Sequence, residues 1–273
     1  MSEANQKDYR SIADLIKAGS EIAGGVSGAV IGGTIIGPAG WLIGGASGPI
    51  ITRLFTKIGN EIKKRVLGDR EESRIGFTYT VGLLKIKSRL EKGEKLRSDG
   101  FFESDEFNRS ASEEILEGVL RSSQGEYQEK KLPYYGNLLA NIAFETSISR
   151  DKANLFLRIA QNLSYQQLCI LQLVSQNEKM QLNWGYEFMR FDELQKFNCI
   201  QPAIEELGNN KLLYIGRQQE GYITSIRIIK LGQELIKLME LSEIAKSEIS
   251  SLDDEFSEIQ EIIKKLKVLK DKH

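Results

Sequence analysis

Residues 22–52, IAGGVSGAVIGGTIIGPAGWLIGGASGPIIT, form an uncharged, glycine-rich stretch on which the interpretation of the whole chain depends. The stretch holds ten glycines in thirty-one residues and no charged side chain, although the chain as a whole is 27% charged. Residues four apart share one face of a helix, so glycines at this interval predict a smooth groove where a second backbone can approach closely. The glycines that recur in this way are Gly24, Gly28 and Gly32, then Gly33 and Gly37, then Gly40, Gly44 and Gly48.

Small residues at this spacing are typical of helices that pack together in lipid. The stretch therefore predicts a glycine-zipper membrane hairpin, which is interrupted at Gly37-Pro38-Ala39-Gly40 and includes Trp41 among its membrane or helix-packing residues. Glycine costs about 1 kcal/mol relative to alanine in a helix interior. Each arm has only about 15–18 residues, whereas ~20 are needed to span a bilayer. These limits favour conditional insertion over a permanent anchor, and the alternative is a soluble hairpin buried against the protein or in a subunit interface.

The composition argues against an enzyme. The only histidine is His273, so neither a Ser-His-Asp triad nor a histidine metal site is expected. Cys169 and Cys199 lie in apolar contexts without a CxxC spacing, which predicts buried free thiols in a reducing compartment. The glycine stretch lacks the Gly-Lys-Ser/Thr ending of a phosphate-binding loop, and no GxGxxG occurs. We expect no catalytic residue, no metal ligand and no cofactor.

The charge balance is close to neutral, at −1 with a sequence pI of about 6.1, so no global basic field indicates nucleic-acid binding. The first ten residues, MSEANQKDYR, are mixed in charge and do not resemble a secretory signal. We therefore expect a cytoplasmic protein with conditional or peripheral association with the inner membrane.

The pattern along the chain predicts a mainly α fold: a helical bundle with an N-terminal glycine-zipper hairpin, a winged-helix-like α+β domain and a coiled-coil-like terminal helix. The expected segments are a lead-in helix (1–21), the hairpin (22–58), a helical domain (59–163), the winged-helix-like domain (164–240) and the tail (241–273).

Several local signals predict individual helices. An apolar stripe at helical spacing runs along residues 68–100 and consists of Ile75, Tyr79, Leu83, Ile86 and Leu90. Ser110 or Ser112 is suited to cap the next helix, with Glu113 and Glu114 at its positive end. Pro133 fits the start of a helix, and Ser164 fits the cap of a helix over 165–175. A basic flank after the glycine stretch could meet anionic headgroups or be an ordinary solvated face; it consists of Arg53, Lys57, Lys63, Lys64 and Arg65.

Two short motifs within residues 110–175 carry a family resemblance. They are KLPYYGNLLAN at residues 131–141 and LSYQQL at residues 163–168. This region resembles bacterial abortive-infection proteins of the Abi-alpha type, in which a helix containing an LLAN-like run precedes a helix of the LS…LxxL kind. The resemblance implies a phage-defence or stress context and no particular chemistry, and it does not extend to the glycine stretch.

From residue 164 the pattern is that of a winged helix. We expect helices over 165–175, 191–197 and 201–209, strands over 212–215 and 222–229, a turn at 218–221, and a terminal helix from Lys230. Candidate nucleic-acid contacts are Arg217 and Arg227 of the wing, but Glu205 and Glu206 on the third helix would repel phosphate. The sequence therefore favours protein docking or a structural use over DNA binding.

The tail carries an apolar seam with alternating steps of four and three residues, typical of a coiled coil: Ala245, Ile249, Leu252, Phe256, Ile259, Ile263 and Leu266. A coiled coil between chains and a helix folded back on its own chain are both compatible with it.

These features together predict a non-enzymatic effector of abortive infection or phage defence. Its hairpin would insert into or permeabilise the inner membrane on activation or oligomerisation. The expected partners are a lipid membrane, further copies of the chain and an activating protein or signal. The alternative is a winged-helix DNA-binding regulator or a soluble protein–protein interaction module.

Overall fold

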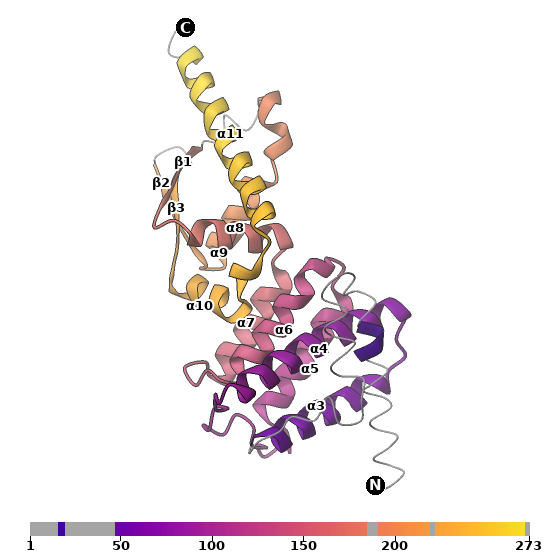
Figure 1. Ribbon diagram of the computed structural model, residues 1–273. Helices are drawn as coiled ribbons and strands as arrows, with labels where there is room; N and C mark the ends of the chain where they lie inside the picture. The colour runs from indigo at the N-terminus through magenta and orange to yellow at the C-terminus, as the bar shows by residue number, and fades with distance from the viewer. Residues whose placement is uncertain (1–15, 20–46, 185–190, 219–221, 271–273) are drawn as a thin grey trace. The chain divides into compact units, whose positions relative to one another are not determined.

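The computed structural model of the chain describes residues 16–19, 47–184, 191–218 and 222–270 (Figure 1). The chain divides into two compact units, residues 1–162 and residues 163–273. The described residues are mainly helical, and their one sheet is small and antiparallel. This confirms the mainly α fold class.

The first unit is built from helices alone in its described part. The helices are α3 (Gly48–Lys63), α4 (Asp69–Glu91), α5 (Ala111–Gly125), the 3-10 turn η1 (Glu129–Lys131), α6 (Leu132–Ile142) and α7 (Arg150–Asn162). Helix α4 packs against α5 and α6, while α5 also contacts α3 and α7. The predicted stripe of α4 forms much of this core, since Ile75, Tyr79, Leu83 and Ile86 are all buried.

Local capping chemistry explains where several helices begin. The Ser110 hydroxyl accepts a hydrogen bond from the Glu113 backbone N–H, and Glu113 reaches back to the Ser110 N–H, which completes a capping box. Ser164 and Gln167 form the same arrangement at α8 (Tyr165–Ser175). Pro133 lies in the first turn of α6. The capping predictions at Ser110, Pro133 and Ser164 are therefore confirmed.

Helices α4 and α6 approach closely because each has a glycine at their contact, Gly82 on α4 and Gly136 on α6. A Cβ added at Gly136 of α6 would lie 2.6 Å from Val81 Cγ1 and 3.1 Å from the Gly82 backbone nitrogen. A Cβ added at Gly82 of α4 would lie 2.9 Å from Leu139 Cδ2. A larger residue at Gly136 would therefore push the two helices apart, whereas at Gly82 the contact is with the flexible end of the Leu139 side chain, which can shift.

The second unit combines helices with the sheet. Its elements after α8 are β1 (Met180–Trp184), η3 (Asp192–Phe197), α9 (Ile200–Asn209), β2 (Leu213–Arg217), β3 (Ile223–Ile228), α10 (Lys230–Met239), η5 (Leu241–Glu243) and α11 (Lys246–Lys270). The strand order is β1-β3-β2, with both pairs antiparallel. The helices and the two strands expected from residue 164 onward are all present within a few residues of their expected bounds, whereas β1 was not expected.

Most of the predicted apolar seam is buried within the second unit, whereas Ala245 is exposed just before α11 and Leu266 is only partly buried. Ile249, Leu252, Phe256, Ile259 and Ile263 are each at most 6% exposed, and α11 packs on α8, β1 and η3. Phe256 lies beside Trp184 with ring centroids 5.1 Å apart. The structure therefore agrees with the second interpretation of the seam, a helix folded back on its own chain.

The expectation for the cysteines is half right. Cys169 on α8 is buried, whereas Cys199, just before α9, is exposed. Cys199 was placed in the core because its neighbours are apolar, but Phe197 and Ile200 fill the buried positions and leave the thiol outside.

The close contact of α4 with α6 gives a stability prediction. Gly136→Ala should lower the free energy of unfolding by about 1–3 kcal/mol, because the new methyl group overpacks against Val81 and Gly82. The control is Gly125→Ala at the end of α5, where an added Cβ meets nothing within 4 Å. Denaturant unfolding should find the control at least as stable as the parent, and equal behaviour of the two variants would contradict the packing.

Candidate functional site

Most of the glycine-zipper residues fall outside the part of the chain that the structure describes. Gly24, Gly28, Gly32, Gly33, Gly37, Gly40, Gly44 and Trp41 belong to this group, all within residues 20–46. Gly48 is described, and it is the buried first residue of α3. Residues 48–58, which the sequence pattern assigned to the hairpin, therefore form the first part of a helix in the core of the first unit.

Helix α3 is held in the first unit by an apolar face. Its buried side chains are Ile51, Leu54, Phe55, Ile58 and Ile62, each at most 7% exposed. The Phe55 ring meets the edge of Tyr79 on α4 at a centroid distance of 5.0 Å. Full burial of such side chains is worth about 1.5–3 kcal/mol each, so the face contributes roughly 10 kcal/mol. Helix α3 is consequently a fixed anchor of the first unit.

The chain before the glycine stretch is fixed to the same unit. Residues 16–19 form a helical turn in which Ile16 and Gly19 are buried. A Cβ added at Gly19 would lie 2.3 Å from the Gly76 carbonyl carbon of α4, so the two backbones touch. Residues 20–46 are thus bounded at both ends by segments packed on one helical unit.

Ion pairs reinforce the position of α3. Lys57 pairs with Glu113 at 2.8 Å, Arg65 pairs with Glu117 at 2.7 Å, and Lys63 pairs with Glu72. Three members of the predicted basic flank are therefore engaged with the chain's own carboxylates. The other two, Arg53 and Lys64, are exposed.

The Glu117 carboxylate of α5 forms ion pairs with three guanidinium groups. Arg65 donates to one carboxylate oxygen at 2.7 Å, Arg109 donates to the other, and Arg121 lies 3.0 Å away one turn further along α5. Burial raises the pKa of Glu117, but the hydrogen bonds from Arg109 and Arg65 outweigh it and hold the pKa below its usual value. Glu117 thus stays ionised.

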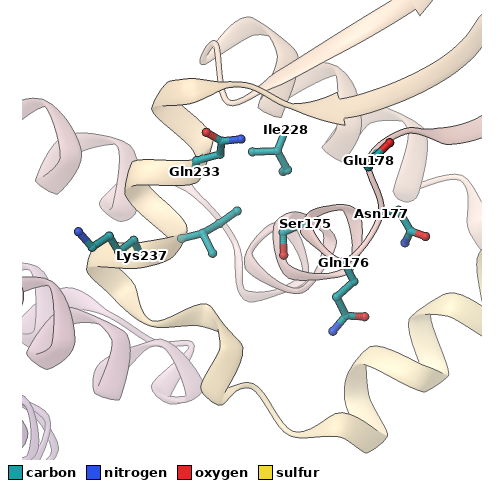
Figure 2. Close-up of a pocket in the computed structure, with 8 residues that line it drawn as sticks. Ser175, Gln176, Asn177, Glu178, Ile228, Gln233 and Lys237 are labelled. Atoms are coloured by element: carbon teal, nitrogen blue, oxygen red, sulfur yellow. The ribbon is translucent and has the colours of Figure 1, made fainter.

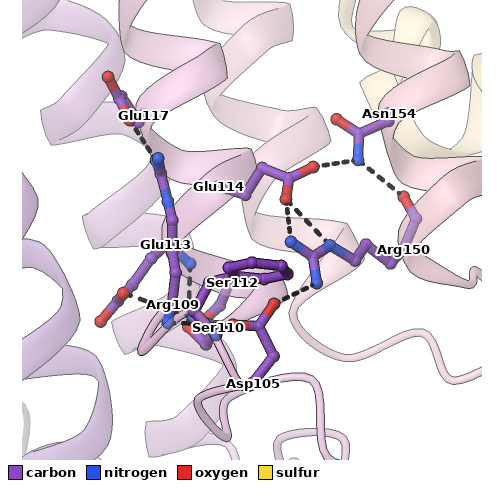
Figure 3. A network of polar contacts seen from close by, with 10 residues as sticks. Asp105, Arg109, Ser110, Ser112, Glu113, Glu114, Glu117, Arg150 and Asn154 are labelled. Carbon is purple, nitrogen blue, oxygen red and sulfur yellow. Dashed lines mark hydrogen bonds and ion pairs between the residues drawn. The ribbon is translucent and has the colours of Figure 1, made fainter.

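A second polar network fixes the loop before α5 (Figure 3). Arg150 of α7 donates to Asp105 at 2.8 Å and to Glu114 at 2.9 Å, and Asn154 also donates to Glu114. Hydrogen bonds from Arg150 hold the pKa of Asp105 below its usual value. These carboxylates are acceptors for fixed arginines, so they have a structural role and form no acid–base pair.

Two residues of the first resemblance motif, Lys131 and Tyr135, lie around the buried carboxylate of Glu126. Lys131 is 2% exposed and pairs with Glu126, which is 7% exposed. The Tyr135 hydroxyl donates to the same Glu126 carboxylate at 3.0 Å. Burial and the adjacent Glu126 charge raise the pKa of Tyr135, which keeps the phenol neutral. Lys131 and Tyr135 of the KLPYY motif therefore have their polar groups engaged at the start of α6.

The candidate nucleic-acid contacts are engaged with protein groups in the structure. Arg217 pairs with Glu205 of α9, and the Arg227 guanidinium lies over the Tyr214 ring at 4.8 Å from its centroid. Gln201, the first polar residue of α9, is only 2% exposed. Glu206 is exposed on the same helix and accepts a hydrogen bond from Gln167 at 2.8 Å. This face of α9 is unsuited to phosphate.

A cavity of about 450 Å³ lies between the end of α8 and α10 (Figure 2). Ser175, Gln176, Asn177 and Glu178 line one side, while Gln233 and Lys237 line the other. The Ser175 hydroxyl donates to the Gln172 carbonyl at 2.7 Å, and the Asn177 amide donates to the Leu173 carbonyl at 3.3 Å. These groups satisfy the last carbonyls of α8, so the cavity marks a helix end and assembles no reactive set.

Within the described ranges, no group of His, Cys, Asp and Glu side chains is placed to hold a metal ion. Among the helices that the structure describes, none has the length and apolar composition to cross a bilayer. No protein-family model, curated protein or solved structure matches the chain. What the candidate site can do therefore has to be argued from its own geometry.

Sequence reasoning missed the arginine cluster on Glu117. Arg65 and Glu117 are 52 residues apart, so no helical spacing relates them. The only local signal was the spacing of Glu117 and Arg121, which are one helical turn apart on α5.

Two tyrosines of the first unit give a matched prediction. The Tyr79 hydroxyl is buried without a hydrogen-bond partner, whereas the Tyr135 hydroxyl donates to Glu126. Tyr79→Phe should leave the free energy of unfolding unchanged or raise it by about 1 kcal/mol, because it removes an unsatisfied group. Tyr135→Phe should lower it by about 1.5–3 kcal/mol, because a hydrogen bond to a charged group is lost. Calorimetric or denaturant unfolding of both variants measures these changes. A larger loss of unfolding free energy in Tyr79→Phe than in Tyr135→Phe would refute the assigned hydrogen bonding of the two hydroxyls.

The depressed pKa of Glu117 predicts an acid dependence of stability. Because the folded chain binds the proton less tightly than the unfolded chain, the ion pairs stabilise fully above the usual value of 4.5 and lose their effect as the pH falls through the folded-state pKa. Glu117→Gln should therefore lower the free energy of unfolding mainly at neutral pH. As the pH falls from about 5 to about 3, the range in which Glu117 titrates, the free energy of unfolding should decline less steeply for the variant than for the parent. Parallel pH profiles for parent and variant would contradict this.

Proposed function

We propose that the protein is a non-enzymatic, membrane-acting effector. In this proposal residues 20–47 are the active element, and the first unit is the scaffold that holds both of its ends. One observation carries the proposal: an uncharged glycine-zipper sequence lies between two fixed boundaries. These are Gly19, which contacts α4, and Gly48, the first residue of α3.

The two fixed boundaries favour a re-entrant hairpin. The uncharged residues before α3 are 22–47, twenty-six in number by their positions. Folded at Pro38, the stretch would have helical arms of 16 residues (22–37) and 9 residues (39–47), which would reach about 24 Å and about 14 Å at 1.5 Å per residue. The hydrocarbon core of a bilayer is about 30 Å thick. The arms are too short to span it singly, which supports partial insertion or insertion of an assembled set of copies whose glycine faces pack together.

The resemblance of residues 131–141 and 163–168 to abortive-infection proteins supports a phage-defence role for this activity. In that setting the protein stays in the cytoplasm until an infection signal or a partner promotes assembly at the inner membrane. Permeabilisation would then halt the infected cell before phage are released.

For the second unit we propose a winged-helix domain used to receive that signal. The order α8, β1, η3, α9, β2, β3 and the sheet order β1-β3-β2 support the assignment. DNA recognition is the weaker use, because Arg217 is paired with Glu205 and α9 exposes Glu206. A protein partner suits this acidic face better. The buried seam of α11 indicates that self-assembly would proceed through the glycine faces and not through the tail.

Release of a dye trapped in liposomes tests the proposed activity. Gly28→Leu and Gly44→Leu fill the predicted zipper faces and should reduce dye release by at least about tenfold, since close backbone approach is lost. The matched controls are Gly45→Leu and Ala46→Leu, which add similar bulk at positions whose neighbours four residues away are not glycine.

The controls should release dye as the parent does. Growth arrest on expression should follow the same order. If the zipper variants release dye and arrest growth as well as the parent does, the zipper mechanism is wrong.

A further inference from the structure

The helical turn before the glycine stretch is packed against the backbone of α4. In this turn, residues 16–19, Ile16 is 2% exposed and Gly19 is buried. A Cβ added at Gly19 would lie 2.3 Å from both the Gly76 carbonyl carbon and the Phe77 backbone nitrogen, and 2.7 Å from the Gly76 carbonyl oxygen. All three atoms belong to the backbone of a helix, so none can move aside as the end of a flexible side chain could. The contact therefore requires glycine at position 19.

This contact lies close in the chain to the proposed active element. Only Ser20 and Glu21 separate Gly19 from the uncharged residues that begin at Ile22. Three residue steps of extended chain reach at most about 11 Å, whereas the hydrocarbon core of a bilayer is about 30 Å thick. As long as Gly19 touches α4, the start of the glycine stretch therefore stays within about 11 Å of that helix.

The two boundaries of the stretch are held with unequal strength. Helix α3 begins at Gly48 and buries five large apolar side chains, each at most 7% exposed. Within the described residues, the turn at 16–19 buries one large apolar side chain, that of Ile16. Because the free energy of burial scales with the apolar area removed from water, this turn is the weaker of the two anchors. It is therefore the boundary at which a small change alters the freedom of the stretch.

We propose that Ile16, Gly19 and Gly76 form an autoinhibitory clasp, called the N-terminal clasp below. It holds the N-terminal end of the glycine stretch on α4 and so limits the entry of residues 22–47 into a bilayer. Weakening the clasp frees this end, while α3 keeps the other end in place. The clasp rests on the proposed function, because it regulates the element to which that function is assigned.

Opening of the clasp is measurable without a membrane. Trypsin cleaves after Lys17, an exposed residue within the turn, and cleavage of a folded segment requires that the segment opens. Gly19→Ala should raise the rate of this cleavage at least about tenfold, because the new methyl group overpacks against backbone atoms. Ile16→Ser removes the buried side chain and should act in the same direction. The matched control is Gly125→Ala, where an added Cβ meets nothing within 4 Å, and it should be cleaved as the parent is.

Entry of the stretch into a bilayer is measurable through its own tryptophan. The chain has two tryptophans, Trp41 in the stretch and Trp184, which is 0% exposed. Quenching of tryptophan fluorescence by vesicles of brominated phosphatidylcholine therefore reports on Trp41. Both clasp variants should reach half-maximal quenching at a lipid concentration at least about threefold lower than the parent, because insertion no longer works against the clasp. The control variant should match the parent.

The same samples separate the clasp from the core of the first unit and from permeabilisation. Both clasp variants should keep the helicity of the parent, because their changes leave the contacts among α3, α4, α5 and α6 in place. Loss of helicity in both would overturn the clasp, since the turn would then be part of the core. Release of a trapped dye from the vesicles is recorded in parallel with the quenching.

The remaining outcomes each decide one claim. Unchanged cleavage in Gly19→Ala, or faster cleavage with unchanged quenching, would overturn the clasp and leave a packing contact. If the quenching midpoint shifts in the clasp variants while no vesicle releases dye, the clasp stands and the proposed permeabilisation fails. Equal dye release and equal quenching by parent and clasp variants would give the converse result. Absence of quenching in every variant would overturn both.

Discussion

The burial of α3 in the first unit is the constraint on which the rest of the structure depends. Phe55 packs on Tyr79, and Ile51 is buried three residues after the helix begins at Gly48. A sequence with no charge between residues 22 and 52 is therefore divided by packing into a core helix and the residues before it. At the other end, the contact of Gly19 with Gly76 fixes the chain to α4. Any membrane activity of the glycine stretch has to operate between these two points.

Charged side chains serve positioning throughout the first unit. Glu114 and Asp105 hold Arg150, while Glu126 accepts hydrogen bonds from the buried Lys131 and Tyr135. Removing one partner of such a buried pair leaves an uncompensated charge, which explains why these groups lie in mutually satisfied sets. Glu117 differs, because three arginines share it and their outer donors face solvent.

The features that sequence predicted are those governed by local chemistry. The caps at Ser110 and Ser164 need only a hydroxyl and a Glu or Gln three residues later, so the sequence next to each helix predicts them. The buried stripe of α4 and the seam of α11 follow from the helical period of their apolar residues. Strand β1 was missed because alternation over only five residues is a weak signal, although Met180, Leu182 and Trp184 do alternate with polar residues and Leu182 and Trp184 are buried. The apolar seam of α11 predicted that this face is buried, but it did not predict which elements cover it. The cluster on Glu117 joins residues from three separate segments, so the sequence indicates only its Glu117–Arg121 pair and not the contributions of Arg65 and Arg109.

The central claim is that α3 remains a fixed anchor while the glycine stretch acts on the membrane. Hydrogen exchange of the backbone amides of α3, measured by mass spectrometry with and without anionic vesicles, tests it most directly. An anchor with five buried apolar side chains should keep its amide protection at the level of the core helices α4 and α6 while the vesicles release dye. Loss of protection across α3 in step with dye release would show that the helix leaves the first unit, and it would contradict the account.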